Sequence, residues 1–326
     1  MSVRHFITAA LAAAVMCGSA APGFPQGGTF PDRTIRIIVP FAAGGGVDTL
    51  ARLMAERMQA RMGVNVIVEN RAGANGTIGG AGVMQSAPDG YTLLFSSNTH
   101  SMAKLVMARP PYDPLTDFTS IARVGEAPLL TVMSNAMPQK TLAEVAEAAR
   151  KEPDKWTAGT PALGSPGHIA TIQFMRLAKV NLTVTPYRGT APALTDVVGG
   201  HIQLLTDAIV VLLPQARDGK VKALAVTSAK RSAIAPDVPT GAESGVPGLE
   251  VLSWYAVWGP KGMPDDVVKR LNAECTSAIG ELARAGKLNE IGVEPVNQTP
   301  QAFADFMAAE VARNGELLKS VNFQPQ

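Results

Sequence analysis

The feature of this sequence that most constrains its fold is a repeated alternation of short β-branched runs with longer amphipathic runs. Residues 35–40 are rich in isoleucine and valine, which predicts a β-strand. In the run that follows, Leu50, Met54 and Met58 recur at four-residue steps and predict a helix with one apolar face. Parallel strands need crossover helices of this kind, so the alternation predicts an α/β fold with mostly parallel sheets flanked by helices.

The alternation continues to the end of the chain through glycine-rich and proline-rich turns. Further strands are expected at residues 64–69, 91–96, 129–133, 156–159, 182–186, 221–227 and 249–258, and further helices at residues 78–86, 141–151, 166–178, 191–198, 264–285 and 300–318.

The chain begins with a charged residue, Arg4, followed by an apolar stretch and a group of small residues. This order is typical of a secretory signal peptide, which we place at residues 1–21, and it predicts a periplasmic protein. The remaining length exceeds that of one ordinary domain, so we expect two lobes. We predict that residues 22–127 and 249–326 form lobe 1 and that residues 128–248 form lobe 2.

Composition argues against several classes of partner and cofactor. The net charge is +2, without a long block of either sign, and aromatic residues are 5% of the chain, so nucleic acid is not an expected partner. After signal-peptide cleavage only His100, His168 and His201 remain, without a metal-ligand spacing. We therefore expect neither a bound metal nor a cofactor.

A glycine loop, PFAAGGGVD at residues 40–48, joins the first strand to the first helix. Glycines let backbone N–H groups approach a ligand, and a helix N-terminus offers unpaired donors and a positive dipole end. The loop is therefore either a main-chain anion site or a tight turn with Asp48 as the helix N-cap.

A second loop of this kind begins at Gly159 and ends at His168. Ser165 is placed as an N-cap and Pro166 as the first helical residue, a favourable pairing at a helix start. Three more helix starts follow strands, at residues 74–77, 97–99 and 189–191. In a parallel sheet such loops gather at the carboxyl ends of the strands, where ligands bind.

Four phrases of the sequence resemble the Bug (TctC-type) family, the extracytoplasmic solute receptors of tripartite tricarboxylate transporters. They are PFAAGGGVD at 40–48, ENRAGANG at 69–76, PYRGTAPA at 186–193 and LAVTS at 224–228, and the similarity covers the whole mature chain. The resemblance implies a two-lobe periplasmic-binding-protein type II fold. It also implies two pincer loops, residues 41–48 and 164–168, that hold a ligand carboxylate through backbone groups.

From the loops and the resemblance together, we expect a ligand site built from both lobes and no catalytic residues. Ala208, Ala162 and Leu163 make this site more apolar than a citrate receptor needs, which favours an aliphatic or aromatic acid. The expected ligand-binding residues are Phe41, Ala43, Gly44, Gly45, Gly46, Asp48, Asn98, Gly164, Ser165, Pro166, His168, Thr190, Ala191 and Asp207.

The expected function is that of a receptor, not an enzyme, that captures a small organic or aromatic carboxylate and delivers it to the small and large membrane subunits of a transporter. One alternative is a periplasmic sensor that presents its closed form to a two-component kinase. A second is an enzyme that uses Asp48 and Asp207 as general acid and base.

Overall fold

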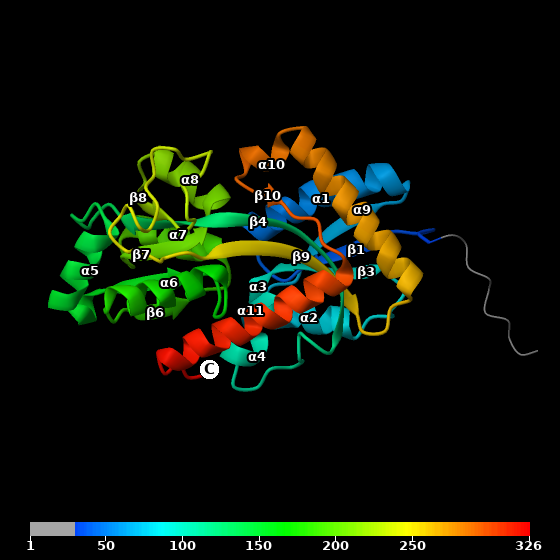
Figure 1. Ribbon diagram of the computed structural model, residues 1–326, viewed down its shortest axis with the longest axis horizontal. Helices are drawn as coiled ribbons and strands as arrows, with labels where there is room; N and C mark the ends of the chain where they lie inside the picture. Colours follow the sequence, from blue (N-terminus) through cyan, green and yellow to red (C-terminus); the bar gives the residue numbers. More distant parts are fainter. Residues whose placement is uncertain (1–29) are drawn as a thin grey trace, which may run out of the picture.

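The computed structural model describes residues 30–326, so the predicted signal peptide lies outside the described residues. The α/β class predicted from the sequence is confirmed, and the molecule is elongated, with two lobes side by side (Figure 1). The strands are β1 (Ile35–Val39), β2 (Val66–Asn70), β3 (Thr92–Ser97), β4 (Phe118–Ser134), β5 (Thr157–Thr160), β6 (Thr183–Pro186), β7 (Leu204–Ala208), β8 (Val221–Val226), β9 (Leu252–Pro260) and β10 (Glu294–Pro295).

The helices lie between these strands in the order expected for crossover units. They are α1 (Gly46–Met62), α2 (Thr77–Met84), α3 (Asn98–Ser101), α4 (Ala103–Val106), α5 (Leu142–Lys151), α6 (Pro166–Ala178), α7 (Thr190–Gly199), α8 (Ile209–Arg217), α9 (Asp265–Arg284), α10 (Lys287–Glu290) and α11 (Pro300–Ser320), with single 3₁₀ turns η1 (Ala74–Gly76) and η2 (Pro153–Lys155).

The strands form a mixed sheet in the order β2-β1-β3-β9-β4-β7-β5-β6, with β8 and β10 also paired to β4. β1 is parallel to β2 and β3, and β5 is parallel to β6 and β7. β4 and β9 run antiparallel to their neighbours, so the sheet is less uniformly parallel than expected. We call the part with β1–β3 the first lobe and the part with β5–β8 the second lobe.

Strand β4 connects the two lobes. It pairs with β9 from Phe118 to Pro128 and with β7 and β8 from Leu129 to Ser134. The chain crosses back from the second lobe to the first next to Thr227. The Thr227 Oγ1 accepts a hydrogen bond from the Leu129 N–H (2.9 Å) and donates one to the Val251 carbonyl (2.6 Å). The predicted lobe boundaries near residues 127 and 248 lie close to these contacts and remain a prediction.

Both lobes have helices on each face of the sheet, because their strands are apolar on both sides. In the first lobe, α1 and α9 cover one face, and α2, α4 and α11 cover the other (Figure 1). In the second lobe, α5 and α6 pack on one face and α7 and α8 on the other. Alternate strand residues point to opposite cores: Tyr255 and Val257 face α1 and α9, whereas Trp254 and Trp258 face α11.

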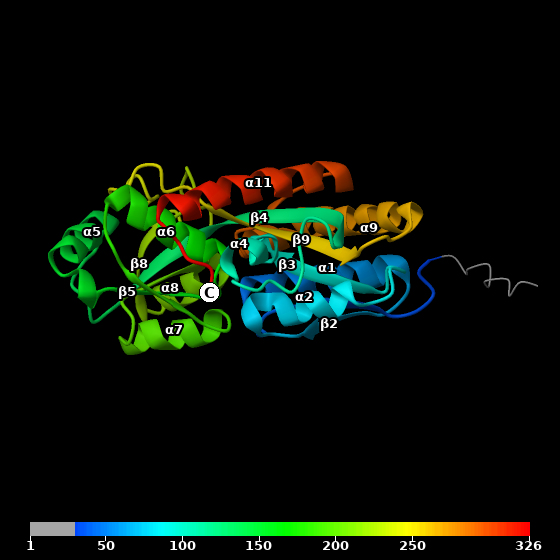
Figure 2. The same ribbon diagram turned by 90° about the horizontal axis from the view of Figure 1, so that it is seen from below.

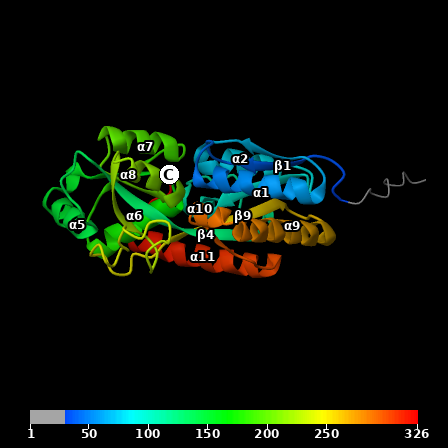
Figure 3. The same cartoon turned by 90° about the horizontal axis from the view of Figure 1, so that it is seen from above.

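Helix α11 lies along both lobes, with its C-terminal end beside the second (Figures 2 and 3). Its Leu318 is buried in an apolar cluster with Met102 and Val106 of the first lobe and Ile169 of α6. The chain therefore connects the lobes at β4, β9 and the end of α11. Within residues 30–326, no helix is long and apolar enough to span a membrane.

Candidate ligand site between the lobes

A cavity of about 50 Å³ lies between the two lobes, at the ends of β1, β3, β5 and β7. Among the described residues its lining includes two carboxylates, those of Asp48 and Asp207, and no Lys, Arg or His. The full lining is Phe41, Ala42, Gly45, Gly46, Val47, Asp48, Ser97, Thr99, Pro161, Ala162, Ser165, Pro166, Gly189, Thr190, Asp207, Ala208, Ser253 and Tyr255.

Four helices of nine or more residues begin at this cavity. The N-cap residues of α1, α6, α7 and α8 are Gly45, Ser165, Gly189 and Ala208, and all four line it. The first N–H groups of a helix have no partner within the helix, and the aligned peptide dipoles give this end a partial positive charge of roughly half a unit. The helix N-termini therefore supply partial positive charge to the cavity, whose described lining has no cationic side chain.

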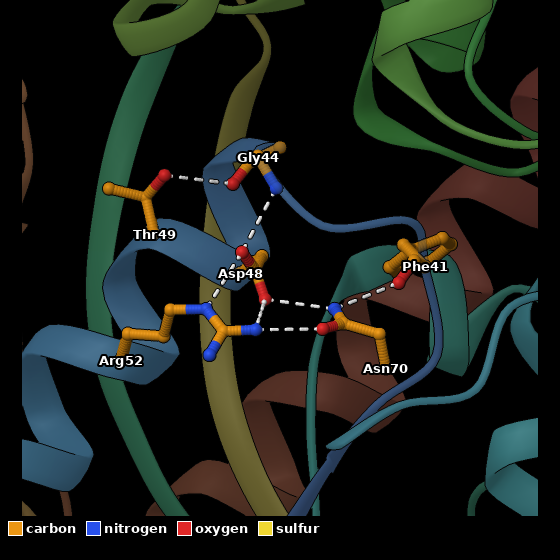
Figure 4. Close-up of polar contacts among 7 residues, drawn as sticks. Phe41, Gly44, Asp48, Thr49, Arg52 and Asn70 are labelled. Carbon is orange, nitrogen blue, oxygen red and sulfur yellow. Dashed lines mark hydrogen bonds and ion pairs between the residues drawn. The ribbon is translucent and has the colours of Figure 1, made fainter. Parts of the chain in front are cut away.

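In the first pincer loop, Asp48 is turned toward its own lobe (Figure 4). Its carboxylate accepts hydrogen bonds from Gly44 N–H (2.9 Å), Arg52 Nε (3.1 Å) and Asn70 Nδ2 (2.8 Å). Burial opposes ionisation, but the bonds from Arg52, Gly44 and Asn70 and the charge of Arg52 together lower the pKa of Asp48 below its usual value. The alternative that Asp48 is the N-cap is wrong, because Gly45 occupies that position.

Two glycines of the first loop are required for distinct reasons. Gly44 has φ +85°, in the left-handed region that favours glycine, so the chain can turn its N–H toward Asp48. Gly46 lies against the second lobe: a Cβ placed there would be 2.8 Å from Ala208 Cβ and 3.2 Å from Tyr255 Oη. The lobes are therefore closed tightly around this point.

The second pincer loop is held by neutral hydrogen bonds among buried side chains. Ser165 Oγ accepts the His168 N–H (3.2 Å) and lies 2.8 Å from Thr160 Oγ1. His168 orients this loop, since its Nδ1 accepts the Gly164 N–H at 3.0 Å. Burial lowers the pKa of His168 to about 4, so the ring is neutral at pH 7 and its Nδ1 is free to accept.

Asp207 lies at the end of β7 and is 7% exposed. Thr190 Oγ1 donates a hydrogen bond to its Oδ2 at 2.5 Å. Burial raises the pKa of Asp207 above its ordinary value, although bonds from Thr190 and the Ala208 N–H act in the opposite direction. Asp48 is hydrogen-bonded to an arginine and an asparagine of its own lobe, whereas Asp207 is not.

The structure brings most, but not all, of the expected ligand-binding residues to the cavity. Those that line it are Phe41, Gly45, Gly46, Asp48, Ser165, Pro166, Thr190 and Asp207. The others, which lie behind it or beside it, are Ala43, Gly44, Asn98, Gly164, His168 and Ala191. Gly44 and His168 act on the loops from behind through their hydrogen bonds, so their expected direct contact with a ligand stays a prediction.

Ten lining residues lie outside the expected ligand-binding set. Ala42 and Val47 belong to the first pincer loop, Ala162 and Ala208 were expected only as apolar parts of the site, and Pro161 and Gly189 lie in the loops that precede α6 and α7. Ser97 and Thr99 flank Asn98 at the predicted helix start and line the cavity, whereas Asn98 does not. Ser253 and Tyr255 come from β9, and alternation along that strand was the only signal for them.

Across the part of the chain that the structure describes, no three His, Cys, Asp or Glu side chains are grouped in a way that could hold a metal ion. The lining presents backbone N–H groups, hydroxyls, apolar surface and the carboxylates of Asp48 and Asp207. This arrangement suits the noncovalent binding of a small anion.

Two α/β lobes joined by crossing strands, with a cavity between them, define a solute-binding protein with the periplasmic-binding fold. The chain belongs to the TctC family, described as the tripartite tricarboxylate transporter family receptor, whose model matches residues 50–323. It is 35% identical to Protein BugT of Bordetella pertussis, over 91% of each chain.

Solved structures give the same result. The chain is 34% identical to R. palustris Rpa4515 with adipate, with a TM-score of 0.87 over 91% of this chain and 100% of that one. It is also 34% identical to MatC (Rpa3494) from Rhodopseudomonas palustris with bound malate, with a TM-score of 0.83 over 89% and 100%. The predicted family and fold are thus confirmed.

Proposed function

We propose that this protein is a periplasmic receptor that encloses a small carboxylate between its lobes and delivers it, chemically unchanged, to the small and large membrane subunits of a tripartite tricarboxylate transporter. The observation that carries the proposal is the convergence of four helix N-termini on a cavity without a cationic side chain. Adipate and malate, the ligands in two similar structures, are both carboxylates.

Backbone donors supply enough energy for such a receptor. Micromolar affinity corresponds to about −8 kcal/mol. A hydrogen bond to a charged acceptor contributes roughly 1.5–3 kcal/mol, so four or five main-chain donors contribute about 6–15 kcal/mol, from which association costs of several kcal/mol are subtracted. Burial of the ligand body against Phe41, Val47 and Ala162 adds an apolar contribution.

The two carboxylates of the lining support binding rather than catalysis. Asp48 is engaged by Arg52, Asn70 and Gly44, which leaves it unsuited to removing a proton from a ligand. Asp207 is paired with Thr190 and lies at the cavity, where it suits a hydroxyl or ammonium group next to the ligand carboxylate. The small cavity favours a compact ligand.

The proposal is tested by native mass spectrometry of freshly purified protein, followed by calorimetry with malate, adipate and short monocarboxylates. We expect one of these acids to bind at micromolar concentration or below, to be recovered unchanged after long incubation, and to reduce the radius of gyration of the unliganded protein. Binding of amines or sugars in place of acids, or conversion of the acid to a product, would contradict the proposal.

A further inference from the structure

One hydrogen bond joins the lobes away from the crossing strands. The backbone N–H of Leu163, in the loop before α6, donates to Oδ1 of Asn75 in η1 of the first lobe, at 3.2 Å. Among the described residues, the other hydrogen bonds between the lobes lie at the crossing itself, including those of Thr227 with Val251. This contact therefore depends on closure of the lobes over the cavity.

The loop that carries Asn75 is held by hydrogen bonds within its own lobe. Gly76 N–H donates to the Gly73 carbonyl (2.9 Å), and Thr77 Oγ1 donates to the Ala74 carbonyl (2.7 Å). Asn75 itself has φ 53° and ψ 33°, a left-handed conformation that asparagine and glycine tolerate better than other residues. The side chain is thus held in a set direction at little conformational cost.

Leu163 needs this partner only in the closed form. The residue is 4% exposed, and its side chain packs in the cluster with Met102 and Val106 of the first lobe. A buried N–H without an acceptor costs about 1–3 kcal/mol, whereas in an open form water satisfies it. Asn75 therefore removes a penalty that closure would otherwise impose on the second pincer loop.

We infer that Asn75 is a positioning residue that fastens the second pincer loop over the cavity in the closed form and so slows ligand release. It does not line the cavity, so it acts through Leu163 and not by touching the ligand. The apolar contacts of Leu163 are tolerant of small shifts, but the hydrogen bond sets the position of the loop. The effect on release rests on the proposed function, whereas the hydrogen bond itself is testable without a ligand.

The test compares three variants with the wild-type protein. Asn75→Gly keeps the left-handed backbone and removes the acceptor, and Asn75→Asp keeps an acceptor oxygen. Asn322→Gly is the matched control, because Asn322 also has φ 53° and is exposed near the C-terminus. Amide hydrogen exchange of Leu163 reports the contact directly, and stopped-flow mixing with malate or adipate gives ligand association and dissociation rates.

We expect Asn75→Gly to speed exchange at Leu163 and ligand dissociation by about three- to tenfold, as loss of one hydrogen bond implies, with association nearly unchanged. Asn75→Asp and Asn322→Gly should behave like wild type. Unchanged exchange in Asn75→Gly, or equal losses in Asn75→Gly and Asn75→Asp, would overturn the inference. If no carboxylate binds the wild-type protein, the proposed function fails and the exchange rates alone decide the role of Asn75.

Discussion

The two pincer loops do the same structural task with different forces. Both present the N-terminus of a helix to the cavity, but the first is organised by the ionised carboxylate of Asp48, whose partner Arg52 is half-exposed. The second is organised by neutral groups, Ser165 and His168, and is almost completely buried. The difference follows from position, because the second loop lies under the end of α11, where Phe323 packs on the His168 ring.

Of these two loops, the one that uses a charge is the one whose ion-pair partner reaches water. A carboxylate beside His168 would be buried without an exposed partner, which is expensive in a medium of low dielectric constant. In the first loop, Arg52 extends from α1 into solvent while it still reaches Asp48 and Asn70. The two loops should therefore respond differently to substitution, pH and salt.

The largest expected effect on ligand binding comes from the contact between the first loop and the second lobe in the closed form. Gly46→Ala places a Cβ 2.8 Å from Ala208 Cβ of the second lobe, whereas Gly45→Ala places one 3.6 Å from Thr190 Oγ1, an ordinary contact. Overpacking of this kind costs about 1–3 kcal/mol, so Gly46→Ala should weaken ligand binding by roughly tenfold or more. Calorimetry of both variants checks this, and equal affinities would mean that the lobes do not close as tightly as described.

The next largest effect tests the charge in the first loop. Asp48→Asn keeps the size of the side chain but removes the ionised acceptor for Gly44, Arg52 and Asn70. We expect the free energy of unfolding at pH 7 to fall by about 1–3 kcal/mol, because hydrogen bonds to a charged group are the strong ones. Urea denaturation measures it, and an unchanged midpoint would show that the loop is held by its glycines alone.

The sequence predicted the second loop better than the chain around it. Helix α6 spans the predicted residues 166–178, because Ser165 and Pro166 are a local signal that needs no information from the rest of the fold. Residues 204–217 were missed, although they form β7 and α8, because their long apolar run contains no glycine to mark the turn between the two.

Contacts between distant segments were the other part that the sequence did not reveal. The part of β4 that pairs with β9 contains Arg123, Gly125 and Pro128, which disrupt a strand pattern, and this pairing orders it. Ser253 and Tyr255 reach the cavity because β9 crosses between the lobes. Local patterns thus predicted the helix starts of the site, whereas the part of the site formed by β9 depends on pairing between strands that are far apart in the sequence.

An effect that is small at pH 7 and grows as the pH falls distinguishes the two loops. The pKa of His168 is lowered to about 4 by burial, against an ordinary value near 6.5, so unfolding takes up a proton between these values and stability falls as the pH decreases from 6.5 to 4. The pKa of Asp48 is also lowered, but because the folded state stabilises its charged form. Its contribution to stability is complete above its ordinary pKa near 3.8 and is lost only as the pH falls below that value.

His168→Asn tests this difference, since an asparagine oxygen can replace Nδ1 as the acceptor for Gly164. We expect the slope of unfolding free energy between pH 4 and 6.5 to decrease by about 1.4 kcal/mol per pH unit, the value of one proton. Other titrating groups, including the buried His100, whose pKa burial lowers to about 3, are the same in both proteins. Equal slopes would place the His168 ring in contact with water.

The smallest expected effect decides what holds Asp48 in place. Arg52→Gln removes an ion pair whose arginine side chain is 50% exposed, so water and salt already screen it, and we expect a loss of only about 0.2–1 kcal/mol that shrinks at high salt. The amide of Asn70 and the N–H of Gly44 still reach the carboxylate in this variant. A loss as large as that of Asp48→Asn would contradict this view, because it would make the exposed ion pair, and not the buried acceptor, the centre of the first loop.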